Sequence, residues 1–367
     1  MQKSYNGEKM RVLFNVGHPA QVHFFRNAIR ILESKGHICK MTAVAKDVSL
    51  DLLDAYGFEY DIVGSAYPTL FSKAVELLKI EKRLYKIARS FKPDILIGGS
   101  GNAYSAHVGK LIHKPSIVFE DSEKGTIEHL LTDRFATVIF TPSSYKKKIG
   151  DNQLYLNGYK ELAYLHPDYF HPSEAALNEL GLTTEDRYVI FRFVTWNADH
   201  DIGHHGIENK IKFAQELEKH GRVLITSEGK LEPELEKYRV RVSPEKIHDL
   251  LYYAQMFVGD SQTMTTEAAV LGVPAIRCNS FVGKDDMSNF IELEEKYDLI
   301  FNYSDSEAAL NKALELVKVP TLKEEWSKKR EKLLHDKIDV TAFIVWFIEN
   351  YPESLKETRS GVPFNSN

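Results

Sequence analysis

The chain has 367 residues, of which 43% are hydrophobic and 27% are charged, and its formal net charge is -5 at pH 7. This composition is typical of a globular protein, and the length predicts two domains that each bury their own core. The weakly acidic balance excludes the broad positive surface of nucleic-acid-binding proteins, so we expect no nucleic-acid partner. No apolar run approaches the roughly 20 residues that cross a bilayer.

The amino-terminal residues and the cysteines both favour a cytoplasmic protein. The first ten residues are polar and lack the apolar core of a signal peptide. Cys39 and Cys278 lie in apolar, strand-like contexts in opposite halves of the chain, without metal-ligand spacing. We therefore expect reduced thiols and a cytoplasmic location.

The first half of the chain alternates short apolar strands with helices of amphipathic period. The predicted strands are 11–16, 38–44, 95–97, 116–119 and 137–140, and the predicted helices are 21–35, 49–56, 73–91 and 103–112. Repeated strand–helix units of this length predict a parallel sheet covered by helices on both faces. Ligands of such sheets bind beyond the carboxyl ends of the strands.

Polar side chains follow three of these strands: His18, Ser100, Asn102 and Glu120. Histidine titrates near neutral pH and a carboxylate can accept a proton, so His18 and Glu120 are the candidate catalytic bases. The glycines beside Ser100 and Asn102 would let the backbone approach a substrate closely. The structural alternatives are a turn histidine, a plain strand–helix turn and a helix cap.

The second half repeats the alternation after an irregular aromatic segment, 157–172, which predicts the interdomain connection. Its predicted strands are 188–193, 222–227 and 256–259, and its predicted helices are 208–219, 244–254 and two or more over 322–350. We expect an amino-terminal domain over 10–160, a carboxy-terminal domain over 173–335, and a last helix over 336–352 that packs back on the first domain.

The stretch 258–276 is the most informative part of the chain. It predicts a strand, a small-residue loop, a helix that begins at Thr265-Thr266-Glu267, and a Gly-x-Pro turn into another strand. Hydroxyls and backbone N–H groups at a helix start bind phosphate, and the glutamate lies within reach of a sugar hydroxyl. The candidate nucleotide-sugar-binding residues here are Asp260, Ser261, Thr263, Thr265, Thr266 and Glu267. The alternative is an ordinary capped helix.

The loop after the strand 188–193 carries three histidines and an aspartate: His200, Asp201, His204 and His205. These are ligands that zinc accepts, but all lie in one loop, so we expect no metal. Contact with phosphate or sugar is the preferred interpretation for His200. Arg192, on the preceding strand, would pair with phosphate or with a buried acid.

Two segments of the sequence resemble those of known protein families. The segment from Ile247 to Pro274 resembles the nucleotide-diphosphate loop of UDP-GlcNAc 2-epimerases and of the peptidoglycan GlcNAc transferase. The pattern Asn15, His18, Pro19, His23, Phe24, Phe25 resembles the opening of an uncharacterised, mainly archaeal GT-B-like family related to those enzymes. The resemblance spans roughly residues 10–350. It implies an α/β protein with two Rossmann-like open parallel-sheet domains, a cleft between them, and Glu267 on the ribose hydroxyls.

The match to the epimerases is incomplete at the catalytic acids. Glu120 matches the second acidic position of their first domain, but the first position falls at Ser100-Gly101-Asn102 and has no carboxylate. Glu128 is out of register for a third acid. We therefore expect a glycosyltransferase that moves a sugar from a nucleotide-diphosphate sugar to an acceptor hydroxyl, polysaccharide or lipid-linked, without a cofactor. The alternatives are a 2-epimerase or hydrolase of nucleotide sugars and a non-catalytic nucleotide-sugar-binding protein.

The helix 73–92 carries a run of cations: Lys79, Lys82, Arg83, Lys86 and Arg89. A basic amphipathic helix can lie on an anionic membrane, which would give the protein a peripheral membrane location and bring it near a lipid-linked acceptor. The alternative is a solvated helix face.

Overall fold

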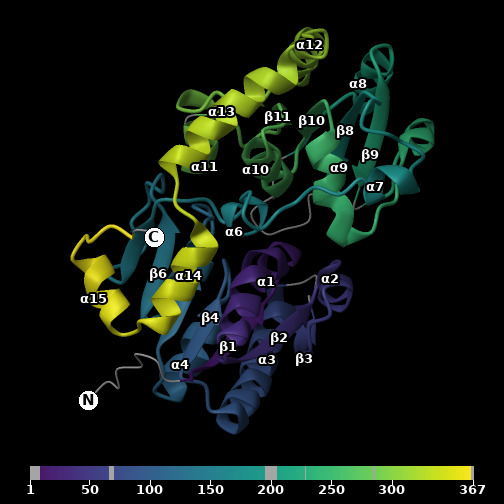
Figure 1. The fold of residues 1–367 in the computed structure, drawn as a ribbon. Coiled ribbons are helices and arrows are strands. Elements are labelled where there is room, and N and C mark those ends of the chain that lie inside the picture. Colours follow the sequence, from purple (N-terminus) through teal and green to yellow (C-terminus); the bar gives the residue numbers. More distant parts are fainter. Residues whose placement is uncertain (1–8, 66–69, 195–204, 228, 284–285, 365–367) are drawn as a thin grey trace. The chain divides into compact units, whose positions relative to one another are not determined.

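The computed structural model describes residues 9–65, 70–194, 205–227, 229–283 and 286–364 (Figure 1). The chain divides into two compact units, which we call unit 1 (Met1–Tyr164 with Lys337–Asn367) and unit 2 (Leu165–Asp336). Each unit holds one open sheet in which all strand pairs are parallel.

Unit 1 is built on a seven-stranded sheet in the order β3-β2-β1-β4-β5-β6-β7. The strands are β1 (Arg11–Val16), β2 (Ile38–Ala45), β3 (Tyr60–Ser65), β4 (Ile95–Gly98), β5 (Ser116–Phe119), β6 (Val138–Pro142) and β7 (Gln153–Leu156). The helices are α1 (Pro19–Ser34), α2 (Ser49–Ala55), α3 (Leu70–Phe91), α4 (Ala103–Leu111), α5 (Thr126–Asp133), α14 (Val340–Glu349) and α15 (Glu353–Arg359). Helix α6 (Leu162–Leu165) lies at the division between the units.

The two faces of this sheet have different cores because successive strand residues point to opposite faces. On one face, aromatic rings of the sheet pack edge-to-face against the helices: Phe119 contacts Phe24 of α1, and Phe140 contacts Phe343 and Phe347 of α14, at ring centroid distances of 4.9–5.2 Å. On the other face, aliphatic residues such as Leu84 of α3 pack against β1, β3 and β4. The carboxy-terminal helix α14 therefore completes the core of unit 1 together with α1.

Unit 2 is built on a five-stranded sheet in the order β12-β11-β10-β8-β9. The strands are β8 (Tyr188–Phe193), β9 (Arg222–Ser227), β10 (Met256–Gly259), β11 (Ala275–Cys278) and β12 (Ile300–Tyr303). The helices are α7 (Ala175–Glu179), α8 (Lys210–Glu218), α9 (Ile247–Tyr253), α10 (Gln262–Leu271), α11 (Ser288–Glu295), α12 (Ser306–Leu316) and α13 (Leu322–Asp336), with two 3-10 turns, η2 (Pro233–Tyr238) and η3 (Pro244–Lys246).

Most predicted elements are confirmed within a few residues, and the differences have local causes. Helix α1 begins at Pro19 because His18 caps it and proline suits the first helical position. The predicted helix 244–254 divides into the 3-10 turn η3 and α9. Helix α10 begins at Gln262, one turn before the predicted start at Thr265, because Ser261 is its N-cap. Strands β3, β7 and β12 were not predicted.

No helix in the described part of the chain combines the length and the apolar character that crossing a membrane requires.

Candidate functional site

In unit 1 the carboxyl ends of β1, β4 and β5 meet at one edge of the sheet, because these strands are parallel neighbours. This edge carries His18 after β1, Ser100 and Asn102 after β4, and Glu120 after β5. Polar side chains from separate parts of the sequence therefore converge there, as the strand pattern predicted.

Glu120 is the central residue of this group. Its side chain is buried, and its carboxylate accepts hydrogen bonds from the Ser100 hydroxyl, from the Ser122 N–H at 2.8 Å and from the Gly101 N–H at 3.3 Å. Burial raises the pKa of Glu120 to about 7, with a further rise from the negative charge of Asp121, while the three hydrogen bonds oppose both effects. A carboxyl that titrates near neutral pH can both accept and donate a proton.

Two aromatic residues that the sequence analysis missed complete the surroundings of Glu120. Nε2 of His129, on α5, lies 3.9 Å from the Glu120 carboxylate and 3.2 Å from the Tyr145 hydroxyl, which follows β6. Both side chains also contact the carbonyl of Ser122, at 2.8 Å from His129 and 2.9 Å from Tyr145. The pKa of the Tyr145 phenol is raised by burial and then by the Glu120 charge. We call Ser100, Glu120, His129 and Tyr145 the Glu120 cluster.

The other two candidate residues of unit 1, His18 and Asn102, form hydrogen bonds with backbone groups of the protein itself. Asn102 is 2% exposed, caps α4 and donates from Nδ2 to the Asn15 carbonyl at 2.9 Å. His18 caps α1, and its Nδ1 accepts from the Ala20 N–H at 3.2 Å. His18 is partly exposed. A catalytic role for His18 and a substrate contact for Asn102 stay predictions.

The glycine-rich loop after β4 is held by Gln21 of α1. Its Nε2 donates to the Ser100 carbonyl at 2.8 Å, and its Oε1 accepts from the Gly17 N–H at 2.7 Å. A Cβ on Gly99 would lie 2.6 Å from Gln21 Cδ, so glycine is needed for this close approach. Gln21 thereby fixes the backbone that carries the Ser100 hydroxyl toward Glu120.

In unit 2 the loop between β10 and α10 has the form that the sequence predicted for an anion site. Ser261 caps α10 by accepting the Met264 N–H at 3.3 Å, and Gly272 ends the helix at φ +74°. The first N–H groups of a helix, here those of Gln262 and Thr263, have no intrahelical acceptor. Thr263 lies in this first turn and is partly exposed. The helix start therefore presents N–H groups, a hydroxyl and the positive end of the helix dipole.

The remaining candidates of this stretch are buried and form hydrogen bonds within the protein. The hydroxyl of Thr265 donates to the Ser261 carbonyl at 2.7 Å and that of Thr266 to the Gln262 carbonyl at 3.4 Å. Asp260 accepts the Val194 N–H at 2.9 Å, which joins the ends of β10 and β8. These residues hold the loop in shape, and direct contact with a ligand stays a prediction for them.

Glu267 forms a buried pair that the sequence analysis missed. Its Oε1 lies 2.9 Å from Nε2 of His248 on α9, and the two side chains are 4% and 2% exposed. The pair joins α9 to the second turn of α10. His248 belongs to the segment that carries the resemblance, but its contact with Glu267 depends on how the two helices pack.

Arg277, at the end of β11, is buried against β12 and α11. Its guanidinium lies 3.6 Å from the ring centroid of Phe290, donates to Asn302 Oδ1 at 2.8 Å and pairs with the carboxylate of Asp286. Burial lowers the pKa of Arg277 and the charge of Asp286 opposes this. Arg192 lies on β8, and its carbonyl accepts the Asp260 N–H at 3.3 Å. Phosphate binding by Arg192 stays a prediction, and His200, with Asp201 and His204, lies outside the described residues.

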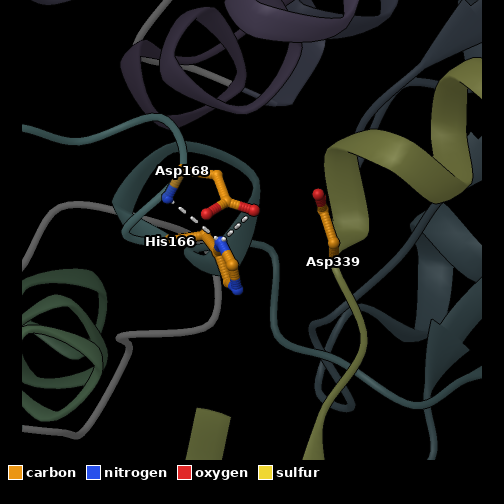
Figure 2. Close-up of side chains that lie close together, drawn as sticks. All are labelled: His166, Asp168 and Asp339. Atoms are coloured by element: carbon orange, nitrogen blue, oxygen red, sulfur yellow. Dashed lines mark hydrogen bonds and ion pairs between the residues drawn. The ribbon is translucent and has the colours of Figure 1, made fainter. Parts of the chain in front are cut away.

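Figure 2 draws His166 and Asp168, which belong to unit 2, together with Asp339 of unit 1. Nδ1 of His166 accepts the Asp168 N–H at 3.3 Å and lies 3.5 Å from the Asp168 carboxylate. Asp339 caps α14 by accepting the Ala342 N–H at 2.9 Å. Each of these side chains has a local structural role, and we assign no metal to them.

Residues 10–351 match the family described as "Protein of unknown function (DUF354)". The chain belongs to this family. A relative, "Uncharacterized protein MJ0665" of Methanocaldococcus jannaschii, is 24% identical over 270 residues, which are 70% of this chain and 78% of the relative.

The solved structures that resemble this member of the family include epimerases and glycosyltransferases. An S. aureus MnaA–UDP complex superposes with a TM-score of 0.67 at 12% identity, over 95% of this chain and 98% of the other. UDP-GlcNAc 2-epimerase from Neisseria meningitidis bound to UDP-GlcNAc gives 0.61 at 14% identity, over 95% and 100%. The spinosyn forosaminyltransferase SpnP gives 0.61 at 13% identity, over 96% and 100%. The predicted family resemblance and the GT-B-like fold are confirmed.

Proposed function

We propose that this protein binds a nucleotide-diphosphate sugar and transfers the sugar to an acceptor hydroxyl, with Glu120 as the general base. The observation that carries the proposal is the buried Glu120 carboxyl, whose pKa is about 7, at the carboxyl edge of the unit 1 sheet. A base of this pKa is half ionised at neutral pH and is suited to removing a proton from a hydroxyl as that oxygen attacks.

The nucleotide half of the proposal rests on unit 2. The N-terminus of α10, with Ser261 as its N-cap and Thr263 in its first turn, offers N–H donors and hydroxyls to a diphosphate. The helix dipole would stabilise the charge that develops on the leaving nucleoside diphosphate, so the transfer needs no metal at this point. The buried His248–Glu267 pair holds the second turn of α10 in place behind this site.

The reaction balances without a further reactant. The acceptor oxygen forms a bond to the anomeric carbon while the bond from that carbon to the diphosphate oxygen breaks. The acceptor proton passes to Glu120, and the electron pair of the broken bond leaves with the nucleoside diphosphate. Ser100, which donates to Glu120, would hold the carboxylate for this step.

The second candidate is a nucleotide-sugar 2-epimerase or hydrolase. It is favoured by the similarity to a UDP-GlcNAc 2-epimerase over 95% of this chain with a TM-score of 0.61. Against it, Ser100 stands after β4 where the epimerase pattern has an acid, so the elimination and readdition of the nucleotide would lack one proton-transfer group.

The test is a single set of incubations in deuterated water with UDP-, GDP-, dTDP- and CDP-sugars, with and without monosaccharide, oligosaccharide and lipid-linked acceptors. Transfer predicts nucleoside diphosphate release that depends on an acceptor, with no deuterium at C2 of the sugar. Release without any acceptor indicates hydrolysis, and deuterium at C2 indicates epimerisation; either result contradicts transfer.

The matched variants are Glu120→Gln and Glu123→Gln. Removing a general base lowers the rate by roughly 10²–10⁴-fold, so we expect a loss of this size for Glu120→Gln. Glu123, whose carboxylate accepts the Lys146 N–H at 2.7 Å, lies in the same loop outside the Glu120 cluster, and its variant should keep the rate. Equal rates for the two variants would remove Glu120 from the reaction.

A further inference from the structure

Helices α3, α4 and α5 form one layer on the face of the unit 1 sheet opposite α1 and α14. His107 of α4 joins the three helices. It pairs with Glu81 of α3, contacts the Leu131 carbonyl of α5 at 2.8 Å and packs on the ring of Phe135 at 4.5 Å. The layer is therefore a continuous surface of unit 1.

Many of the exposed large apolar side chains of the described residues belong to this layer. Ten large apolar side chains of the described residues are exposed, and half of them lie in these helices or just after α5: Leu78, Tyr85, Leu111, Leu130 and Phe135. Three of these leucines are at least 60% exposed. Clusters of this kind mark surfaces that bind a partner or a membrane.

The outward stripe of α3 combines apolar and cationic side chains. Leu78, Lys82, Tyr85 and Arg89 follow one another at spacings of three or four residues, which places them on one side of the helix, with Lys86 beside them. All five are exposed, and none of the three cations pairs with a described carboxylate.

The acids of the described part of α3 point away from this stripe. Glu76 is buried and lies 3.3 Å from Lys79, and Glu81 pairs with His107. The stripe therefore presents positive charge next to exposed leucine and tyrosine. This combination is complementary to anionic headgroups above an acyl region, and it suits duplex nucleic acid poorly because the apolar side chains would have no partner there.

We propose that the α3–α4–α5 layer docks on the surface of an anionic lipid bilayer. Lys82, Lys86 and Arg89 lie against the headgroups, and Leu78 and Leu111 enter the headgroup–acyl boundary. The docking is peripheral, and it is independent of the proposed transferase activity because it uses none of the residues of the Glu120 cluster or of the α10 loop.

The test is co-sedimentation of the full chain with vesicles of phosphatidylcholine alone or with phosphatidylglycerol. We expect binding to the phosphatidylglycerol vesicles that weakens with salt, and little binding to phosphatidylcholine. The triple variant K82E/K86E/R89E should lower the partition coefficient by roughly tenfold or more. The variant L78S/L111S should lower it while keeping the salt dependence.

The matched control is K219E/K237E/K328E, which makes the same change in net charge on exposed lysines of unit 2. It should bind vesicles like the wild type, and circular dichroism should show that all variants are folded. No binding to anionic vesicles, or equal loss in the triple variant and its control, would overturn the proposal. A dimer in sedimentation velocity that only the α3 variants dissociate would instead assign the surface to a second copy of the chain.

Discussion

The two units share a parallel sheet with helices, but Glu120 of unit 1 and two buried acids of unit 2, Glu267 and Asp286, have different partners. In unit 2, Glu267 lies 2.9 Å from the ring of His248, and Asp286 pairs with Arg277. In unit 1, Glu120 is as buried as these acids but is held by a hydroxyl and two backbone N–H groups, with the His129 ring 3.9 Å away. Burial then dominates and raises the pKa of Glu120 to about 7.

The difference shows that the partner of a buried carboxyl, more than its burial, decides what it can do. A carboxylate close to a guanidinium or an imidazole is suited to holding structure. A carboxylate whose hydrogen bonds come only from neutral donors can still take up or release a proton. The surfaces of the two units also differ, since every exposed large apolar side chain of the described residues belongs to unit 1.

The largest expected effect on stability is in the paired acids of unit 2. Arg277→Met would leave Asp286 buried without its guanidinium, and breaking such a pair costs about 3–5 kcal/mol. Urea denaturation should show this loss in the free energy of unfolding. Lys329→Met is the control, because the Lys329–Asp298 pair is exposed at Asp298 and should contribute less than about 1 kcal/mol. Equal losses for the two variants would mean that the buried Arg277–Asp286 pair contributes no more to stability than the Lys329–Asp298 pair.

A smaller effect on stability is expected at Glu120, and it arises from a shifted pKa rather than from a broken ion pair. Because its pKa is raised from 4.5 to about 7 on folding, the folded state binds the proton more tightly, and the free energy of unfolding should fall as pH rises from about 4.5 to about 7. Glu120→Gln removes this dependence, so the stability of the variant relative to wild type should rise over that range by at most about 3 kcal/mol. Thermal unfolding across pH measures it, and parallel profiles would contradict the raised pKa.

The smallest effect concerns two helices of unit 2 whose N-cap side chains accept a backbone N–H. Ser261→Ala and Asp305→Ala each remove a cap, of α10 and α12, and each should cost about 1 kcal/mol of stability. Only Ser261→Ala should also weaken nucleotide binding, because its hydroxyl lies at the proposed phosphate site. Calorimetric titration compares the two, and equal affinities would separate Ser261 from the ligand.

Much of the fold could be predicted from the sequence because central strands such as β1 and β10 are short, apolar runs followed by polar loops. Strands β3 and β7 could not, since they lie at the edges of the sheet and mix polar with apolar residues, as in QLYL. The Glu120 cluster comes together because β4, β5 and β6 are neighbours in the sheet. The residues next to each strand in the sequence do not determine this order.

In the candidate site, too, some residues could be predicted from the sequence and others could not. Glu120 and the Ser261 loop follow apolar strands directly, and their position at strand ends made them visible in the sequence. His129, Tyr145 and His248 were missed because their contacts, with Glu120, His129 and Glu267 respectively, come from helix packing or neighbouring strands rather than from a spaced motif. The missing carboxylate after β4 was visible, and the structure places the Ser100 hydroxyl against Glu120.

The most direct test of the central claim is calorimetric titration of the full chain with UDP, GDP, dTDP, CDP and their sugar conjugates. Nucleotide-sugar binding at the start of α10 predicts saturable, one-site binding of at least one nucleoside diphosphate and its sugar conjugate, weakened in Ser261→Ala. Absence of heat and of any thermal stabilisation with all of these ligands at millimolar concentration would contradict the claim.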